Sequence, residues 1–291
     1  MLYLAGAIIF SSWLTIAFKI AGRMGISTFQ AIIFNYFTCV ITGVFFDGKT
    51  PSVDVIVKSN WFPWALLMGC MFVSVFNLVA YTTRKSGLAI ASVANKLSLV
   101  IPFLFSVFLF NETITALKIA GIFLALIAVF LTCMPSSDTD KSSRKTSGLL
   151  LLPVILFVGS GLLDSLIKFV EANFINEGNN NHYIIASFAS AGVIGSFILI
   201  WFLMVGKERF DSRAVLAGVL IGVPNYFSLW CLVNVLKLHA GNSSSIIPIT
   251  NMGIVLFSTL VAAFFFREHL SKVNWVGIIL SILAISMIAF G

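Results

Sequence analysis

Several ionisable side chains fall inside stretches that are otherwise apolar, and Lys96 is the most telling of them. It lies near the start of an apolar stretch that runs from 88 to 110, and its neighbours Asn95 and Ser98 are polar. A helix rises about 1.5 Å per residue, so Lys96 is expected about 12 Å deep. One interpretation is a cationic anchor for a carboxylate or phosphate. The other is a lysine that reaches back to the nearer interface or pairs with a carboxylate.

Asp164 is the one acidic residue well inside such a stretch. Lys168 follows four residues later, a spacing at which an acid and a base pair on one helix. The two interpretations are therefore a structural salt bridge and a carboxylate that binds and releases a proton.

Amide, hydroxyl and indole groups are spread over the other apolar stretches. Taken singly, each is best interpreted as a hydrogen bond that holds helices together, at about 0.6 kcal/mol. Taken as a set, they predict the lining of a polar cavity. With Asn95, Lys96 and Asp164, the predicted substrate-binding residues are Ser12, Trp13, Asn35, Tyr36, Asn77, Tyr81, Asn225, Tyr226, Trp230 and Asn251.

Three prolines, Pro102, Pro224 and Pro248, also interrupt apolar stretches. Each removes a backbone donor and can kink a helix. The carbonyls released in this way could line a site, or the prolines could serve packing alone.

The amino-acid composition indicates whether water or lipid surrounds these polar residues. The chain has 291 residues, of which 59% are hydrophobic and 10% charged, and its mean hydropathy is +1.04. Soluble domains are about 45–50% apolar and about 25% charged, so lipid is expected to surround most of this chain. The net charge of +7 comes mainly from short connections, which argues against nucleic acid as a partner. The four cysteines show no paired spacing, so neither a disulfide framework nor a metal site is predicted.

The hydrophobic pattern predicts ten membrane-spanning helices, each about 20 residues long. The first is expected to stay in place as a span, because no basic region or cleavage motif accompanies it. The predicted ranges are 2–21, 26–46, 61–83, 88–110, 114–133, 148–170, 182–205, 214–236, 243–265 and 272–290.

An internal repeat divides these helices into two sets of five. At a constant offset of 156 residues, Asn95 matches Asn251 and Gly121 matches Gly277. The same offset relates Glu112 to Glu268, Lys19 matches Lys168 at 149, and Gly43 matches Gly195 at 152. The predicted organisation is a first repeat over 1–134, a polar linker over 135–147 and a second repeat over 148–291. Five is an odd number, so two fused copies must have opposite orientations. Inverted repeats of this kind characterise many secondary transporters.

The charge distribution predicts an orientation. The odd-numbered connections carry eleven basic residues and the even-numbered ones carry Lys49, Lys58 and Lys237. The positive-inside rule places the odd connections in the cytoplasm and both termini outside.

The chain resembles the drug/metabolite transporter superfamily, in particular its ten-helix EamA-type members. The resemblance rests on a helix that ends in Glu, a short polar turn and a Gly-bearing final helix, found twice: Glu112 with Gly121, and Glu268 with Gly277. Pro102 in the preceding helix also fits, although its repeat counterpart is Ser258, and Lys19 at the end of the first helix fits as well. The resemblance implies a central cavity lined by helices 1, 3, 4, 6, 8 and 9, with helices 5 and 10 peripheral. It also implies export or exchange of amino acids, metabolites or drug-like compounds, and cytoplasmic termini, which the charge count opposes.

The sequence therefore predicts a multi-pass transporter of the plasma membrane, or of the inner membrane in a bacterium, that moves a small metabolite by alternating access. No Gly-rich phosphate loop and no hydrolase or protease motif is present, so neither a cofactor nor an enzyme activity is expected. The expected partners are a small solute and membrane lipid. A homodimer through helices 5 and 10 is a further expectation, from the small-residue patterns Gly121-x-x-x-Ala125 and Gly277-x-x-x-Ser281. A passive channel, a receptor and an intramembrane enzyme are the alternatives.

Overall fold

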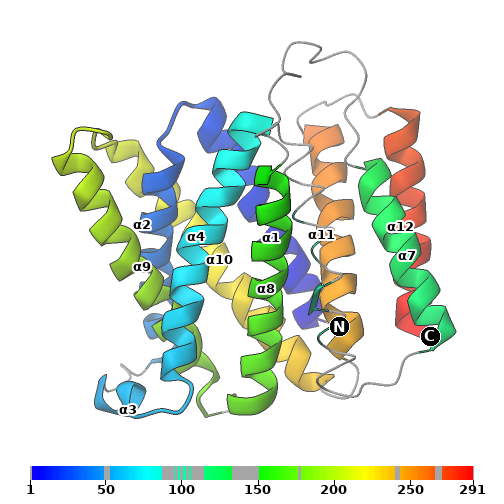
Figure 1. Ribbon diagram of the computed structural model, residues 1–291, viewed down its shortest axis with the longest axis horizontal. Helices are drawn as coiled ribbons and strands as arrows, with labels where there is room; N and C mark the ends of the chain where they lie inside the picture. The colour runs from blue at the N-terminus through cyan, green and yellow to red at the C-terminus, as the bar shows by residue number, and fades with distance from the viewer. Residues whose placement is uncertain are drawn as a thin grey trace. The chain divides into compact units, whose positions relative to one another are not determined.

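The computed structural model is all-α over the residues it describes, and no strand occurs among them (Figure 1). Lys96, Glu112, Glu268 and the predicted linker lie outside that set. The described residues are 2–48, 53–86, 95, 98, 101–102, 105, 115–132, 151–175, 178–239, 243–265 and 271–290.

The helices begin and end close to the residues expected from the apolar pattern. For α11 and α12 the bounds coincide with the prediction, and α3 is a short helix that the pattern did not predict. The predicted range 88–110 lies mostly outside the described residues. The helices are α1 (Leu2–Arg23), α2 (Thr28–Asp47), α3 (Val53–Val57), α4 (Phe62–Ser86), α7 (Ala116–Thr132), α8 (Leu151–Phe174), α9 (Asn180–Met204), α10 (Ser212–Leu238), α11 (Ser243–Phe265) and α12 (Lys272–Phe290).

Five of these helices are long and apolar enough to cross a membrane, counted over the described part of the chain. They are α1, α2, α4 as far as Thr82, α9 and α10. Large apolar side chains on them are exposed: Phe45 is 83% and Phe197 70% accessible. A water-soluble protein rarely leaves so many apolar side chains uncovered. The fold is therefore that of an all-α protein compatible with several membrane crossings.

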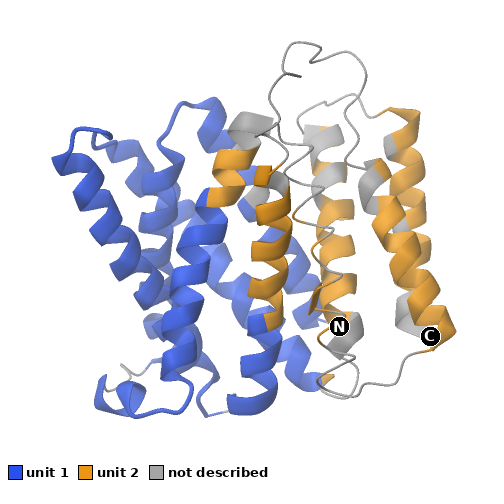
Figure 2. Ribbon diagram, viewed as in Figure 1, with its two compact units in different colours: residues 1–77, 166–238 blue, residues 78–165, 239–291 orange. Residues whose placement is uncertain are grey.

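The chain forms two compact units, and each takes helices from both halves of the sequence (Figure 2). Unit 1 comprises Met1–Asn77 and Leu166–Leu238, which include α1, α2, α3, most of α4, the end of α8, α9 and α10. Unit 2 comprises Leu78–Ser165 and His239–Gly291, with α7, the start of α8, α11 and α12. Each unit thus holds corresponding helices of the two predicted repeats.

In unit 1, α2 packs against α9 (Figure 1). Each contact between them has a counterpart in which the equivalent residues of the two predicted repeats trade places. A Cβ added at Gly43 would lie 2.5 Å from Cγ1 of Ile185, and one added at Gly195 would lie 3.0 Å from Cγ1 of Ile33. The offset of 152 residues that relates Gly43 to Gly195 also relates Ile33 to Ile185. Because the end of α2 meets the start of α9, the two helices are antiparallel.

Tyr36 and Phe188, also 152 residues apart, stack on each other between these two contacts. Their ring centroids are 6.3 Å apart and their planes are inclined by 30°. A residue that touches its own counterpart lies on the axis that relates the two copies. The α2–α9 contact therefore has local two-fold symmetry, with its axis perpendicular to both helices.

A second pair of contacts in unit 1 follows the same rule. Gly222 of α10 faces Thr38 of α2, and Gly69 of α4 faces Ser190 of α9. Gly69 and Gly222 are 153 residues apart, and Thr38 and Ser190 are 152 apart. At both places a small residue lets two backbones approach closely, which is how helices pack in membranes.

In unit 2, α7 packs against α12 (Figure 1). Gly121, Ala125 and Gly277 are buried, so these members of the small-residue patterns serve packing within the chain. A homodimer through the same helices stays a prediction. It would use their exposed residues, such as Phe123 and Ile282.

Candidate functional site

The centre of the candidate site is a pair of buried carboxamides, Asn35 of α2 and Asn225 of α10. Nδ2 of Asn225 donates to Oδ1 of Asn35 at 3.0 Å, and both side chains are buried. Nδ2 of Asn35 donates in turn to the carbonyl of Ile32 at 3.4 Å. The thiol of Cys39 donates to the carbonyl of Gly222 at 3.2 Å. Two predicted site residues are thus brought together, in an apolar setting where each amide needs its partner.

Two glycines of α10 set the helix separation that makes this pair. An added Cβ at Gly218 would lie 2.9 Å from the backbone nitrogen of Asn35, and one at Gly222 would lie 2.7 Å from its carbonyl oxygen. Any larger residue at these positions would push α10 away from α2. The spacing Gly-x-x-x-Gly places both glycines on one face of the helix.

Tyr36 and Tyr226 flank the amide pair in sequence and are both fully buried. Their hydroxyl groups find no hydrogen-bond partner among the described residues. A buried hydroxyl without a partner costs about 1–3 kcal/mol, so each of these two groups needs a specific explanation. The ring of Tyr36 is held by Phe72 and Phe76 of α4, with centroids 6.3 Å away in each case.

Trp13 of α1 is held against α10 by a bond that depends on Pro224. Its indole Nε1 donates to the carbonyl of Leu220 at 3.0 Å. That carbonyl lies four residues before Pro224, which has no N–H to bond it within the helix. The carbonyl released by the proline is therefore used to join α1 to α10. On the same helix pair, the hydroxyls of Ser11 and Ser228 are 2.6 Å apart.

Trp230 belongs to an aromatic cluster at the end of α10. Its ring lies 5.2 Å from that of Tyr3 and 5.3 Å from that of Phe46, with the planes steeply inclined in both cases. Such edge-to-face contacts add about 0.5–1.5 kcal/mol each beyond the area they bury. The cluster therefore fixes the ends of α1, α2 and α10 to one another.

The remaining predicted site residues have other surroundings. Ser12 donates to the carbonyl of Ile8, and Asn77 to that of Val73, each at 2.7 Å within its own helix. Tyr81 is 50% exposed. In unit 2, Asn95 accepts a bond from Ser98 through its carbonyl, Asp164 is half-buried, and Nδ2 of Asn251 finds no partner among the described residues.

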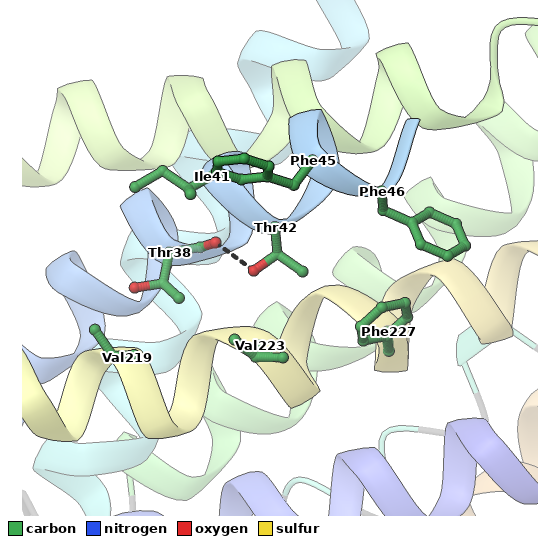
Figure 3. A pocket seen from close by; sticks show the side chains of 8 residues that line it. All are labelled: Thr38, Ile41, Thr42, Phe45, Phe46, Val219, Val223 and Phe227. Atoms are coloured by element: carbon green, nitrogen blue, oxygen red, sulfur yellow. Dashed lines mark hydrogen bonds between the residues drawn. The ribbon is translucent and has the colours of Figure 1, made fainter. Parts of the chain in front are cut away.

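An apolar groove of about 530 Å³ lies beside the amide pair, between α2 and α10 (Figure 3). The two threonine hydroxyls in its wall are bonded within α2: that of Thr38 to the carbonyl of Phe34 at 2.9 Å, and that of Thr42 to the carbonyl of Thr38 at 2.7 Å. The groove thus offers little to a polar solute, and none of the predicted site residues that the structure describes lines it. Its lining is Thr38, Ile41, Thr42, Phe45, Phe46, Val219, Val223 and Phe227.

Two buried charged residues of α8 were not predicted as a site. Lys168 is 1% and Glu171 7% exposed, and the charges of Lys237 and Lys168 both act on the Glu171 carboxylate. One of the two interpretations of Asp164 pairs it with Lys168, and the sequence pattern does not single out Glu171. The spacing Lys168-x-x-Glu171, followed by a basic residue near the end of α10, was the signal in the sequence.

At one end of unit 1, the connection between α1 and α2 is joined to the connection between α9 and α10. The buried amide of Gln30 donates to the carbonyl of Arg209 at 2.6 Å and accepts from the backbone N–H of Asp211 at 2.9 Å. The backbone N–H of Ser27 donates to the Asp211 carboxylate at 3.2 Å. The hydrogen bond from the Arg213 side chain, 3.1 Å long, is the main cause that holds the pKa of Asp211 below its usual value.

At the other end of α2, Asp47 is joined to the start of α9. Nδ2 of Asn181 donates to its carboxylate at 2.8 Å, and the imidazole of His182 lies 3.6 Å from it. Within the described ranges, no three His, Cys, Asp or Glu side chains gather in a way that could hold a metal ion.

These features describe an all-α protein whose long apolar helices are those of a multi-pass membrane protein in length and composition. No protein-family model matches the sequence. An uncharacterized protein of Haemophilus influenzae is 31% identical over 285 residues, which cover 96% of this chain and 94% of the relative. The chain belongs to the same family as that protein. A solved crystal structure, described only as that of a protein, matches with a TM-score of 0.73 over 99% of this chain and 96% of that one. At 14% identity, this likeness concerns the fold alone.

Proposed function

We propose that this protein is a secondary transporter with ten spans in two inverted repeats, which moves a small metabolite across the membrane by alternating access. The observation that carries the proposal is the exchange of contacts between α2 and α9. Gly43 meets Ile185 as Gly195 meets Ile33, with Tyr36 stacked on its counterpart between them. Two copies related by an axis perpendicular to the helices have opposite orientations in a membrane, the arrangement found in many secondary transporters.

The directions of the helices in unit 1 support a ten-span topology. Helices α2 and α10 are parallel, because Phe34 meets Gly218 and Thr38 meets Gly222. Helices α1 and α10 are antiparallel, because Tyr3 near the start of α1 meets Trp230 near the end of α10. If each span runs opposite to the one before it, an even number of spans must lie between the antiparallel helices α2 and α9. Helices α4, α7 and α8 and a span over the predicted range 88–110 give four, which makes α9 antiparallel to α2, as observed. Without a span over 88–110 the number would be three, and the two helices would be parallel.

The connections at the two ends of unit 1 agree with the same topology. The α1–α2 and α9–α10 connections, both odd-numbered, meet through Gln30 and Asp211. The even-numbered connections after α2 and before α9 meet through Asp47 and Asn181. Since basic residues gather in the odd connections, we propose that the Gln30 end is cytoplasmic.

The predicted site residues are proposed to line the solute path. The hydroxyls of Tyr36 and Tyr226 and the amide of Asn251 support this role, because they are buried polar groups without a partner among the described residues. The Asn35–Asn225 pair joins α2 to α10 next to the two tyrosines in the sequence. Membership of the EamA-type drug/metabolite transporters, export or exchange as the direction, and the plasma or inner membrane as the location belong to the same proposal.

Uptake into liposomes tests the proposal. The purified chain is reconstituted and offered a pool of amino acids and organic acids, with and without a pH gradient, as wild type, Lys96→Ala and Lys58→Ala. Lys58 is an exposed residue outside the predicted spans and serves as the control. Saturable uptake that Lys96→Ala abolishes and Lys58→Ala preserves is the expected result. Flux that rises linearly with concentration would indicate a channel and contradict the proposal.

A further inference from the structure

The two ends of the contact between α2 and α9 are held by different side chains at equivalent positions. Gln30 and His182 are each the third residue of their helix, and they are 152 residues apart, the offset that relates α2 to α9. Gln30 joins the start of α2 to the connection that follows α9. His182 joins the start of α9 to Asp47, the last residue of α2. The two-fold relation between the helices therefore matches an amide at one end with an imidazole at the other.

The amide of Gln30 cannot respond to pH. It donates to the carbonyl of Arg209 at 2.6 Å and accepts from the backbone N–H of Asp211 at 2.9 Å, and its side chain is fully buried. A carboxamide has two N–H donors and a carbonyl acceptor and carries no charge. Gln30 therefore makes the same bonds in mildly acidic and in mildly basic solution.

The imidazole of His182 can respond to pH. Its Nε2 lies 3.6 Å from Oδ2 of Asp47, and Oδ1 of the same carboxylate accepts from Nδ2 of Asn181 at 2.8 Å. The side chains of His182 and Asp47 are 25% and 20% exposed, so water reaches both. Histidine is the side chain type whose charge ordinarily changes between pH 5 and 8. A neutral imidazole leaves the carboxylate to Asn181, whereas an imidazolium adds attraction between opposite charges across 3.6 Å.

Other charged and titratable groups face this end from the neighbouring helices. The charge of Asp47 acts on the hydroxyl of Tyr226 in α10, and α3, which packs against α9, carries the exposed Asp54, with the exposed Lys58 after it. Aspartate, lysine and tyrosine ordinarily titrate below pH 5 or above pH 8. The remaining charged groups near the connections at this end are Glu171, on which the charges of Lys237 and Lys168 act, and Lys49 and Glu177, which lie outside the described residues.

We propose that His182 is a proton-sensitive tie between α9 and α2. Its protonation strengthens the contact with Asp47 and holds this end of the two helices together, while the Gln30 end is held alike at either pH. In the orientation proposed above, the Gln30 end is cytoplasmic and the His182 end is external, so an acidic medium acts on the outer end alone. The tie itself follows from the contacts of the two helices, and its effect on solute movement rests on the proposed transport function.

Hydrogen exchange of the purified full chain at pH 5 and pH 8 tests the tie, with each rate divided by that of an unstructured peptide at the same pH. The N–H of Tyr183, bonded to the carbonyl of Asn179 at 3.0 Å, reports on the His182 end. Its counterpart 152 residues earlier, the N–H of Ala31, is bonded to the carbonyl of Ser27 at 3.0 Å and reports on the other end. In wild type we expect the start of α9 to be protected about two- to fivefold more at pH 5 than at pH 8, the range of a partly exposed ion pair. We expect the start of α2 to be protected equally at both.

Four variants identify the groups responsible. His182→Gln gives the second repeat the residue that the first repeat carries, and it is expected to remove the pH dependence, as is Asp47→Asn. His182→Lys carries a charge at both pH values and is expected to keep the higher protection at both. His239→Gln, at an exposed histidine, is the control and should behave as wild type does.

Equal protection of the start of α9 at the two pH values in wild type, or a pH dependence that His182→Gln retains, would overturn the tie. An equal change at the starts of α2 and α9 would also overturn it. Asp47→Asn decides the matter if His182→Gln does not fold. Uptake by the same preparations in liposomes separates the two proposals. A pH-dependent tie without uptake of any solute would contradict transport and leave the tie, and uptake without pH-dependent protection would overturn the tie and leave transport.

Discussion

Replacing Gly222 by alanine tests one of the two close contacts between α2 and α10. The added Cβ would lie 2.7 Å from the carbonyl oxygen of Asn35 and 2.8 Å from Cγ2 of Thr38. Because one of these atoms is backbone, the helices must move apart. Overpacking of this kind costs about 1–3 kcal/mol, and the better helix propensity of alanine returns up to about 1 kcal/mol. We expect a net loss of about 1–2 kcal/mol in the free energy of unfolding.

The assay is unfolding of the purified chain by SDS in mixed micelles, with two companion variants. Gly22→Ala is the control, because nothing lies within 4 Å of the added Cβ, and it should leave stability unchanged or slightly higher. Gly69→Ala places a Cβ 2.7 Å from the backbone nitrogen of Ala191 and should cost about as much as Gly222→Ala. If Gly222→Ala and Gly22→Ala agree within about 0.5 kcal/mol, the reasoning about helix contact is refuted.

Two further predictions concern bonds at other places in unit 1. Trp13→Phe should lower the free energy of unfolding by about 1 kcal/mol, because it leaves the Leu220 carbonyl without a donor. In a Pro224→Ala background the loss should be smaller, because the helix itself can then bond that carbonyl. A double-mutant cycle measures the difference. The hydrogen bond from Arg213 lowers the pKa of Asp211 in the folded chain. The stabilisation from this bond should therefore be present above the unfolded pKa of about 3.9, and it should be lost as the pH falls through the folded pKa. Stability curves against pH check this, and Asp211→Asn should lack that step.

The sequence predicted helix positions well, because the length of an apolar stretch is a local property. The ranges 243–265 and 272–290 coincide with α11 and α12. It could not predict which polar groups meet, because that depends on which helices are neighbours. Asn35 and Asn225 are 190 residues apart in sequence and were both singled out, yet nothing in the pattern joined them. Glu171 was missed because it lies at the end of an apolar stretch, where a charged residue is ordinary.

The two repeats agree where backbones touch and differ where polar side chains pair. Close packing acts alike on both copies, which explains why Gly69 and Gly222 correspond. Neither asparagine of the amide pair is repeated in the other copy: Asn35 corresponds to Ser187, and Asn225 corresponds to Phe72. A change at one member alone would have left a buried amide without its partner, at a cost of about 1–3 kcal/mol, so the two positions are expected to change together. The close backbone contacts common to both repeats therefore constrain the fold. The Asn35–Asn225 pair, which occurs in one arrangement only, is where one repeat could acquire chemistry that the other lacks.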